Sequence, residues 1–275
     1  MKKVAALGPK GTFSEFAVKE YKKKIDSDIE MKFYPTISKV VMAAENECDI
    51  AIIPIENTLD GFVQVTLDLL NKTNLSIVYE FALPIQFAFA ANSKMDEVKR
   101  IYAQFKTQGQ CLEFLEKYDK FEVITTESNG TSLENLKKGV WEEGAIIPAY
   151  AIEKEKEFKY IIENVTDAED NETRFIVLSK QKDKSYHSGE YKTGIIISDA
   201  NADKPGALWK VLKEFALCEI NLTSIISRPT KKGLGQYYFF IEAEGNYDGD
   251  NKLKGAIEDI KQHSVVKIVG SYLSL

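Results

Sequence analysis

The pattern of apolar and polar positions between residues 49 and 70 predicts a strand, a polar turn and a helix. The run Ile50–Ile53 is uninterrupted and β-branched, which is typical of a strand buried on both faces in a parallel sheet. Apolar residues recur at helical spacing up to Leu70, so we expect a helix to begin just after Gly61. Such a turn places the free N–H groups of a helix beside polar side chains, where small anions bind in open α/β sheets. A well-capped loop without a ligand has the same pattern.

The same alternation of short apolar runs and amphipathic stretches extends from the start of the chain to about residue 178. Further strands are expected at Val4–Leu7, Met31–Tyr34, Ser76–Leu83, Ile85–Ala91, Ile101–Tyr102, Glu122–Thr125, Ala145–Ile147 and Phe175–Leu178. Helices are expected around Phe16–Tyr21 and at Ser38–Asn46, Gln110–Lys117, Ser132–Lys138 and Ala149–Phe158. Strands that alternate with helices over this length favour parallel α/β units.

The pattern changes after the polar stretch Gln181–Glu190, which we interpret as a linker. Beyond it, a turn is expected at Asp203–Gly206. The expected elements are, in order, a strand at Gly194–Ser198, a helix at Leu208–Phe215, strands at Leu222–Ser227 and Tyr237–Glu242, a helix at Leu253–Lys261 and a strand at Val265–Val269. This β-α-β-β-α-β order is the ferredoxin-like split motif, so we expect a second, smaller domain.

The composition limits the binding partners, the location and the catalytic groups that we expect. The 275 residues carry a net charge of −6, which argues against a non-specific nucleic-acid binder, and no apolar segment suits a signal peptide or a membrane span. Cys48, Cys111 and Cys218 are isolated and lack metal-ligand spacing, which fits reduced thiols in a cytoplasmic protein. The histidines His187 and His263 are both remote from the polar turns, so catalysis must use hydroxyls, carboxylates, amides or arginine.

Two more polar stretches lie at strand ends and offer the same chemistry. In Gly8–Ser14 a strand leads into a helix that Thr12 or Ser14 can cap, and the glycine spacing fits neither a Walker loop nor a dinucleotide fingerprint. In Asp167–Ser179 an acidic, turn-rich approach leads into a strand that begins near Thr173 and Arg174. An arginine in this position could equally pair with neighbouring acids at the surface.

Together these stretches resemble the prephenate dehydratases that carry a C-terminal ACT regulatory domain. The sequence GPKGTFS at 8–14 matches the family's opening GPxGTFS, and 54–70 matches its PIENSxxGxVxxTLDLL. Asn171–Phe175 matches the family's NxTRF stretch. The ACT signatures are matched at Gly206–Leu208, Ile220–Thr223 and Ser227–Pro229. Each motif alone is weak, but their shared order along nearly the whole chain is specific.

The resemblance implies a two-lobed α/β catalytic region, similar to type II periplasmic binding proteins, and a ferredoxin-like βαββαβ ACT domain. We expect the catalytic domain at 1–180, with its second lobe at about 81–165, and the ACT domain at 191–275. The implied reaction is the decarboxylating dehydration of prephenate to phenylpyruvate in L-phenylalanine biosynthesis, with feedback control by L-phenylalanine. Aromatisation drives it, so we expect no cofactor and no metal. ACT domains generally pair, so we expect a homodimer or tetramer, without nucleic-acid or membrane partners.

The matching motifs also imply roles for individual residues. Thr173 is the expected catalytic residue, which donates a hydrogen bond or proton toward the leaving hydroxyl group. Arg174 either pairs with a substrate carboxylate or braces its loop, and Glu56 either holds its loop or takes part in catalysis. The other expected substrate-binding residues are Thr12, Ser14, Asn57, Thr58, Gly61, Thr131, Ser132 and Phe175. The expected L-phenylalanine-binding residues are Gly206, Ala207, Leu208, Asn221, Leu222, Ser227, Arg228 and Pro229.

The sequence departs from the family pattern at a few positions. Thr58 stands at a serine position and Thr131-Ser132 at a Ser-Thr pair, so the hydroxyl groups are kept. Gln104–Lys106 stands where a His-Pro-Gln run is common. In the ACT domain Glu219 replaces a glycine and Ile226 the glutamate of the ESRP motif. These two changes leave open an oligomerisation domain with a lapsed effector site.

Two other functions stay open on the sequence. A non-catalytic sensor could use the same two-lobed region, although loss of Thr173 would be its expected sign and Thr173 is present. A prephenate decarboxylase that retains the hydroxyl group would differ only in its product. No helical mutase domain precedes Val4, so we expect no fused chorismate mutase.

Overall fold

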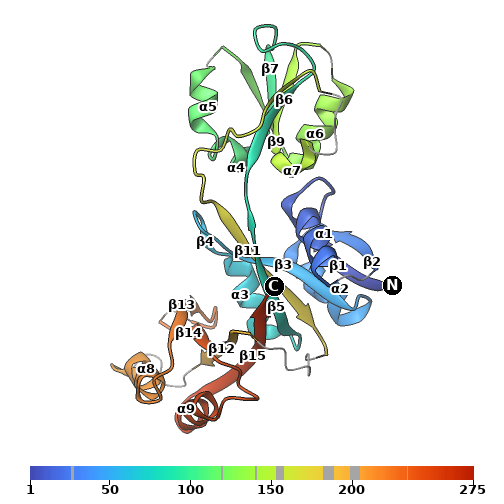
Figure 1. The fold of residues 1–275 in the computed structure, drawn as a ribbon. Helices are drawn as coiled ribbons and strands as arrows, with labels where there is room; N and C mark the ends of the chain where they lie inside the picture. The colour runs from blue at the N-terminus through green and yellow to red at the C-terminus, as the bar shows by residue number, and fades with distance from the viewer. Residues whose placement is uncertain are drawn as a thin grey trace.

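The chain forms three parts in the computed structural model (Figure 1). A first lobe lies in the middle, a second lobe at one end and the C-terminal part at the other. The structure describes residues 1–25, 28–118, 120–139, 141–152, 158–181, 189–198, 205–233 and 235–275. No helix in these ranges is long and apolar enough to cross a membrane.

The first lobe is built on five strands in the order β5-β11-β3-β1-β2. They are β1 (Lys2–Leu7), β2 (Ile29–Tyr34), β3 (Ile50–Asn57), β5 (Ser76–Pro84) and β11 (Glu172–Ser179). Its helices are α1 (Phe13–Ile25), α2 (Ile37–Asn46) and α3 (Gln64–Lys72), and a short strand, β4 (Gly61–Phe62), pairs with the end of β3. Strand β11 runs antiparallel to both β3 and β5. The run Ile50–Ile53 is fully buried because α1 covers one face of the sheet, while α2 and α3 cover the other.

The second lobe has its own five-stranded sheet, in the order β10-β6-β9-β7-β8. Its strands are β6 (Phe87–Ala91), β7 (Arg100–Gln104), β8 (Glu122–Thr126), β9 (Glu143–Pro148) and β10 (Tyr160–Ile162). Its described helices are α4 (Phe105–Gln108), α5 (Leu112–Lys117), α6 (Asn129–Lys138) and α7 (Ala149–Ile152). The chain enters this lobe between β5 and β6 and returns between β10 and β11, so two segments connect the lobes (Figure 1).

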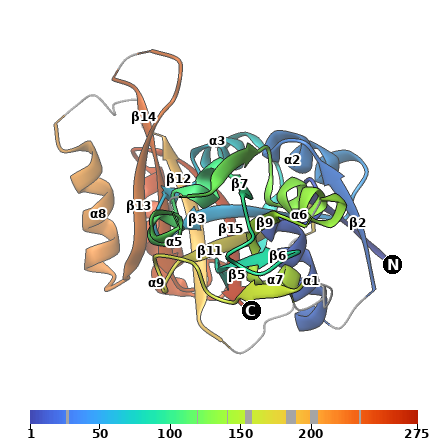
Figure 2. The same ribbon diagram turned by 90° about the horizontal axis from the view of Figure 1, so that it is seen from above.

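The C-terminal part continues the sheet of the first lobe. Its elements are β12 (Tyr191–Ser198), α8 (Ala207–Leu217), β13 (Leu222–Pro229), β14 (Tyr237–Glu244), α9 (Asn251–Lys261) and β15 (Val265–Ser274). Helices α8 and α9 cover one face of these strands, and the other face packs on α3 of the first lobe. Strand β15 pairs in parallel with β5, where Leu273 lies opposite Tyr79, so a single sheet runs through both parts. Figure 2 shows α8 at one edge of the molecule and β2 at the opposite edge.

The predicted two-lobed α/β region and βαββαβ order are confirmed. The break predicted at Pro84 falls where the chain leaves the first sheet. Helix α3 begins at Gln64 and not directly after Gly61, because Gly61 and Phe62 first form β4. Strand β15 extends five residues beyond the predicted end at Val269, and those residues reach β5. Parts of the predicted helix at Ala149–Phe158, the linker and the turn at Asp203–Gly206 lie outside the described residues.

The junction between β15 and β5 requires a glycine at position 270. Gly270 has φ +147°, and a Cβ there would lie 2.2 Å from the carbonyl oxygen and 2.8 Å from the nitrogen of Ile77. Backbone atoms of a paired strand cannot move away as a flexible side chain can. The close approach of the two strands therefore depends on the missing side chain.

We expect Gly270→Ala to lower the free energy of unfolding by about 2–4 kcal/mol, because it adds both a backbone clash and an unfavourable φ. The matched control is Gly255→Ala, in the exposed middle of α9, where a Cβ meets no atom within 4 Å. That change should stabilise the protein by about 0.5–1 kcal/mol, since alanine favours the helix. Urea unfolding measures both, and a Gly270→Ala protein as stable as the parent would contradict the junction described above.

Candidate active site

A cavity of about 380 Å³ lies between the two lobes and contains the predicted catalytic residue. Thr173 and Phe175 of β11, Asn57 of β3, and Thr12 and Ser14 at the start of α1 line it from the first lobe. The second lobe contributes the segment around α4 and the start of α6. Apolar side chains form part of the wall: Leu7, Phe13, Val63, Ile85, Phe87 and Phe175. The cavity thus combines an apolar surface with several hydroxyl and amide groups.

Asn57 holds the hydroxyl group of Thr173 in a defined orientation. The Asn57 side-chain oxygen accepts hydrogen bonds from the backbone N–H groups of Leu59 and Asp60, both at 3.0 Å. Its Nδ2 is thereby directed to Thr173 Oγ1, to which it donates at 3.0 Å. Within the described ranges Thr173 Oγ1 accepts this bond and donates none, so its own hydrogen is available to a molecule in the cavity.

Neighbouring side chains fix the segment that leads into β11. Thr58 Oγ1 accepts from the Glu172 backbone N–H at 3.0 Å and donates to the Asp170 carbonyl oxygen at 3.2 Å. Asn57 Nδ2 also donates to Asn171 Oδ1 at 2.8 Å, and Asn171 is fully buried. Because these bonds link β3 to the start of β11, the polar turn after β3 sets the position of Thr173.

Two helix N-termini, one from each lobe, point their first turns toward the cavity. Thr12 and Ser14 lie at the start of α1, and Ser128 caps α6 by accepting from the Thr131 backbone N–H at 3.0 Å. The loop before α1 touches the first turn of α6 at Gly11 and Gly130, where an added Cβ on Gly130 would lie 2.1 Å from the Lys10 carbonyl oxygen. First-turn N–H groups of a helix have no partner inside it, so this pair of termini favours a negatively charged ligand.

Lys106 is the one basic side chain that lines the cavity in the part of the chain the structure describes. Its Nζ lies 3.0 Å from Asp60 Oδ2, so the pair bridges the two lobes. Both side chains are more than half exposed, at 71% and 55%, and exposed pairs of this kind contribute little to stability. A carboxylate in the cavity can therefore replace Asp60 as the partner of Lys106.

The structure brings together five of the ten residues expected at the catalytic and substrate-binding site. Thr12, Ser14, Asn57, Thr173 and Phe175 line the cavity. The other five do not line it. Thr58 holds the approach to β11, Gly61 adopts φ +72° at the start of β4, and Arg174 faces the C-terminal part. In the first turn of α6, Thr131 bonds to the N-cap Ser128. Ser132 bonds to Thr126 at the end of β8 and is fully buried.

Sequence reasoning did not assign a site role to seven polar residues that line the cavity from the second lobe. They are Gln104, Lys106, Thr107, Gln110, Glu127, Ser128 and Asn129. A signal existed for Ser128, because a serine before a helical pattern is a typical N-cap. The segment around α4 was connected with a wall of the cleft only through its departure from the family's His-Pro-Gln run, and the crossing between the lobes is what brings Lys106 opposite Asp60.

The residues expected to bind L-phenylalanine lie at the two ends of the C-terminal part. Gly206, the N-cap of α8 with φ +83°, and Arg228 lie at the end of the sheet where β12 finishes. Asn221 and Leu222 follow α8 at its other end, and Asn221 Nδ2 donates to Glu244 Oε1 at 2.8 Å. Eleven helical residues separate the two groups, about 16 Å at 1.5 Å per residue. One small ligand therefore cannot reach both groups within one chain.

Arg228 makes a contact that its motif did not predict. Its Nη2 lies 3.1 Å from Asp68 Oδ1 on α3, and Tyr238 Oη donates to the same oxygen at 2.8 Å. Lys231 Nζ approaches the other Asp68 oxygen at 2.7 Å. Burial alone would raise the pKa of Asp68, but the bonds from Lys231, Tyr238 and Arg228 hold it below its usual value. Asp68 therefore joins the first lobe to the C-terminal part.

Comparison with known proteins identifies the family. The prephenate dehydratase family model matches residues 4–183, and the ACT domain model matches residues 195–262. The chain is 33% identical to the prephenate dehydratase of Methanocaldococcus jannaschii over 96% of its own length and 95% of that protein. It is 34% identical to the prephenate dehydratase of Lactococcus lactis subsp. cremoris over 98% of its own length and 97% of that protein. The crystal structure of a prephenate dehydratase from Arthrobacter aurescens in complex with L-Phe superposes with a TM-score of 0.86 at 28% identity, over 98% of this chain and 90% of that one. The chain belongs to the prephenate dehydratase family and carries a C-terminal ACT domain.

Proposed function

We propose that the protein is a prephenate dehydratase that converts prephenate to phenylpyruvate, carbon dioxide and water. The observation that carries this proposal is the Thr173 hydroxyl group, which Asn57 orients while its hydrogen stays available in the cavity. Curated relatives named for this activity align with nearly the whole chain. The apolar wall suits the substrate ring, and the hydroxyl and amide groups suit its polar substituents.

The reaction needs orientation and charge stabilisation more than a nucleophile. The electron pair of the ring carbon–carboxylate bond moves into the ring as carbon dioxide leaves, and the ring expels its hydroxyl group as water once a proton is supplied. Thr173 donates a hydrogen bond to that departing oxygen, where negative charge develops. The bond from Asn57 polarises the Thr173 hydroxyl group and makes it a better donor.

We expect Thr173→Val to lower kcat at least ~100-fold, because valine keeps the shape and removes the donor. Thr173→Ser, which restores a hydroxyl group, should recover most of that loss. The matched control is Thr125→Val, the same change at an exposed strand position that does not line the cavity, and it should leave kcat unchanged. Phenylpyruvate formation from prephenate measures all three, and a folded Thr173→Val protein with normal turnover would remove Thr173 from the mechanism.

Lys106 and the two helix N-termini are our candidates for holding the substrate carboxylates. We expect Lys106→Gln to raise KM about 10-fold with little change in kcat, as for an interaction made equally in the ground and transition states. Lys99→Gln is the control, since Lys99 pairs with Glu142 away from the cavity. An unchanged KM in Lys106→Gln would assign the carboxylates to the helix termini alone.

The product distinguishes the remaining alternatives. Phenylpyruvate formed above the spontaneous rate supports the dehydratase. A decarboxylated product that retains the hydroxyl group would identify the decarboxylase, and binding of prephenate without turnover would identify a sensor.

A cytoplasmic location is part of the same proposal, because Cys48, Cys111 and Cys218 are separate free thiols.

We also propose that L-phenylalanine regulates the enzyme at an interface between two chains. The separation of Gly206 from Asn221 along α8 supports this, since a second chain can bring the missing half of the site. A homodimer is then the smallest functional unit, and two dimers can form a tetramer. Control of activity requires that L-phenylalanine bind two global states with different affinities.

Titration calorimetry should detect L-phenylalanine binding to the parent protein, and Asn221→Ala should weaken it about 10-fold through loss of an amide hydrogen bond. D-phenylalanine is the control ligand and should bind more weakly. Turnover without effector should be unchanged in Asn221→Ala. If the parent protein gives neither heat nor a thermal shift with L-phenylalanine, the ACT domain is an oligomerisation domain with a lapsed site.

A further inference from the structure

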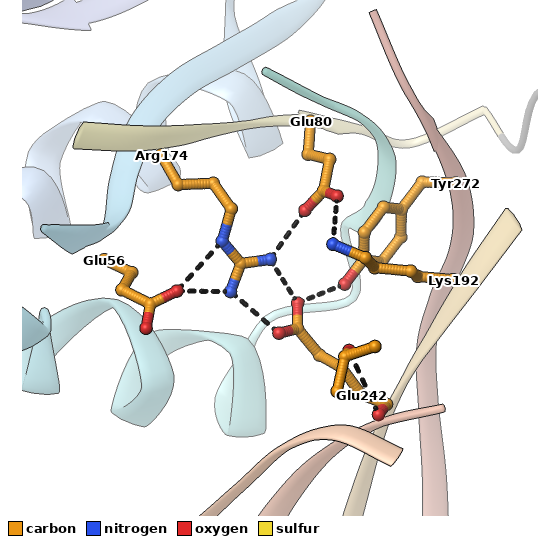
Figure 3. A network of polar contacts seen from close by, with 7 residues as sticks. Glu56, Glu80, Arg174, Lys192, Glu242 and Tyr272 are labelled. Carbon is orange, nitrogen blue, oxygen red and sulfur yellow. Dashed lines mark hydrogen bonds and ion pairs between the residues drawn. The ribbon is translucent and has the colours of Figure 1, made fainter. Parts of the chain in front are cut away.

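Arg174, the residue after Thr173, is held entirely by carboxylates on the side of the sheet away from the cavity (Figure 3). Its Nη1 and Nη2 each lie 2.7 Å from an oxygen of Glu242, so this pair is bidentate. Nη1 also lies 2.6 Å from Glu80, and Nη2 and Nε lie 2.9 and 3.1 Å from Glu56. All three guanidinium nitrogens are therefore engaged, which leaves no donor group for a substrate carboxylate.

Glu242 comes from the ACT domain, while the other two carboxylates come from the first lobe. Glu56 lies on β3 and Glu80 on β5, the two strands that flank β11, whereas Glu242 lies on β14. Tyr272 of β15 donates to Glu242 at 2.5 Å, and Lys192 of β12 donates to Glu80 at 2.7 Å. The network around this guanidinium group thus includes side chains from six strands: β3, β5 and β11 of the first lobe, and β12, β14 and β15 of the ACT domain.

The network is buried and its members are charged. The side chains of Glu80 and Glu242 are only 3% and 1% exposed, and that of Arg174 is 14% exposed. Burial alone would raise the pKa of Glu242, but the bonds and charge of Arg174 and the Tyr272 hydrogen bond hold it below its usual value. Burial also keeps the pKa of Tyr272 well above its usual value, so its hydroxyl group remains a donor. A carboxylate so enclosed has no water to replace a lost partner.

The backbone beside Thr173 is where such an anchor has most effect. Thr173 and Arg174 are consecutive in β11, so their side chains point to opposite faces of the sheet. The register between β11 and β3 shifts between Arg174 and Phe175, where Ile55 of β3 has no partner on β11, while β11 keeps a regular register with β5 over the same residues. The bulge disrupts the ladder on the β3 side of Arg174, so side-chain contacts take a larger part there in setting how neighbouring residues are aimed.

We infer that Glu242 of the ACT domain and Arg174 are positioning residues for Thr173, so that the catalytic hydroxyl is aligned only when the ACT domain is docked on the first lobe. This inference rests on the proposed dehydratase activity. The ACT domain then contributes to the chemical step through a direct ion pair, in addition to any effector site it carries.

The test compares Glu242→Gln with Asp68→Asn. Asp68 also joins the two parts, and within the described residues its side chain bonds to Arg228, Lys231 and Tyr238 and not to β11. If Glu242 positions Thr173, Glu242→Gln lowers kcat at least 10-fold with KM unchanged, and Asp68→Asn leaves kcat as in the parent. If both carboxylates merely hold the domains together, the two variants lose thermal stability and kcat to a similar extent, and the inference is wrong.

A double-mutant cycle separates positioning from general weakening. In a Thr173→Val background, Glu242→Gln should cause no further loss of kcat, because the group it positions is already absent. Additive losses would overturn the inference. The parent protein is assayed first, so absence of phenylpyruvate from it would refute the proposed function and not this inference.

If Glu242→Gln does not fold, Tyr272→Phe tests the inference in its place, since it removes only the hydroxyl group that donates to Glu242. A two- to five-fold lower kcat at unchanged KM supports positioning, and an unchanged kcat overturns it. Phe62, whose ring lies 5.6 Å from the guanidinium carbon, is left intact in every variant.

Discussion

The alternation of side chains along β11 is the constraint on which the rest of the structure depends. This strand lies between β3 and β5 in the middle of the sheet, and its residue 173 faces the cavity while residue 174 faces the ACT domain. The wall of the cavity and the contact with the ACT domain therefore share one backbone segment. Neither side chain can be re-aimed without moving the other, because a strand places consecutive residues on opposite faces.

The cavity accommodates negative charge in a protein that is itself negatively charged. The net charge is −6, and Asp60 and Glu127 line the cavity. Local donors counter them: the first turns of α1 and α6, and Lys106 opposite Asp60. Close contact between Gly11 and Gly130 brings the two helix termini from different lobes to one place. Such donors act over a few ångströms, where overall charge matters little.

The sequence predicted the fold well because local periodicity and motif order determine it. Strand Ile50–Ile53, the break at Pro84 and the βαββαβ order all followed from spacing. Of the residues that line the cavity, Thr12, Ser14 and Asn57 lie where the sequence pattern pointed, since a strand end beside a helix start is a local signal. Lys106 and the Arg174–Glu242 pair were missed as site features, because both depend on contacts between segments at least 46 residues apart. The sequence left two roles open for Arg174, a bond to a substrate carboxylate or support of its loop, and only the position of β14 distinguishes them.

The pairing of β15 with β5 also bears on how the two domains can be separated. A chain ending after β11 would lack the residues opposite Tyr79 and Glu80, and β5 would become an open edge with unpaired N–H and C=O groups. Such an edge pairs readily with another chain and promotes aggregation. It would also leave the buried carboxylate of Glu80 without its Lys192 partner. The ACT domain thus acts as a cap on the edge of the catalytic sheet.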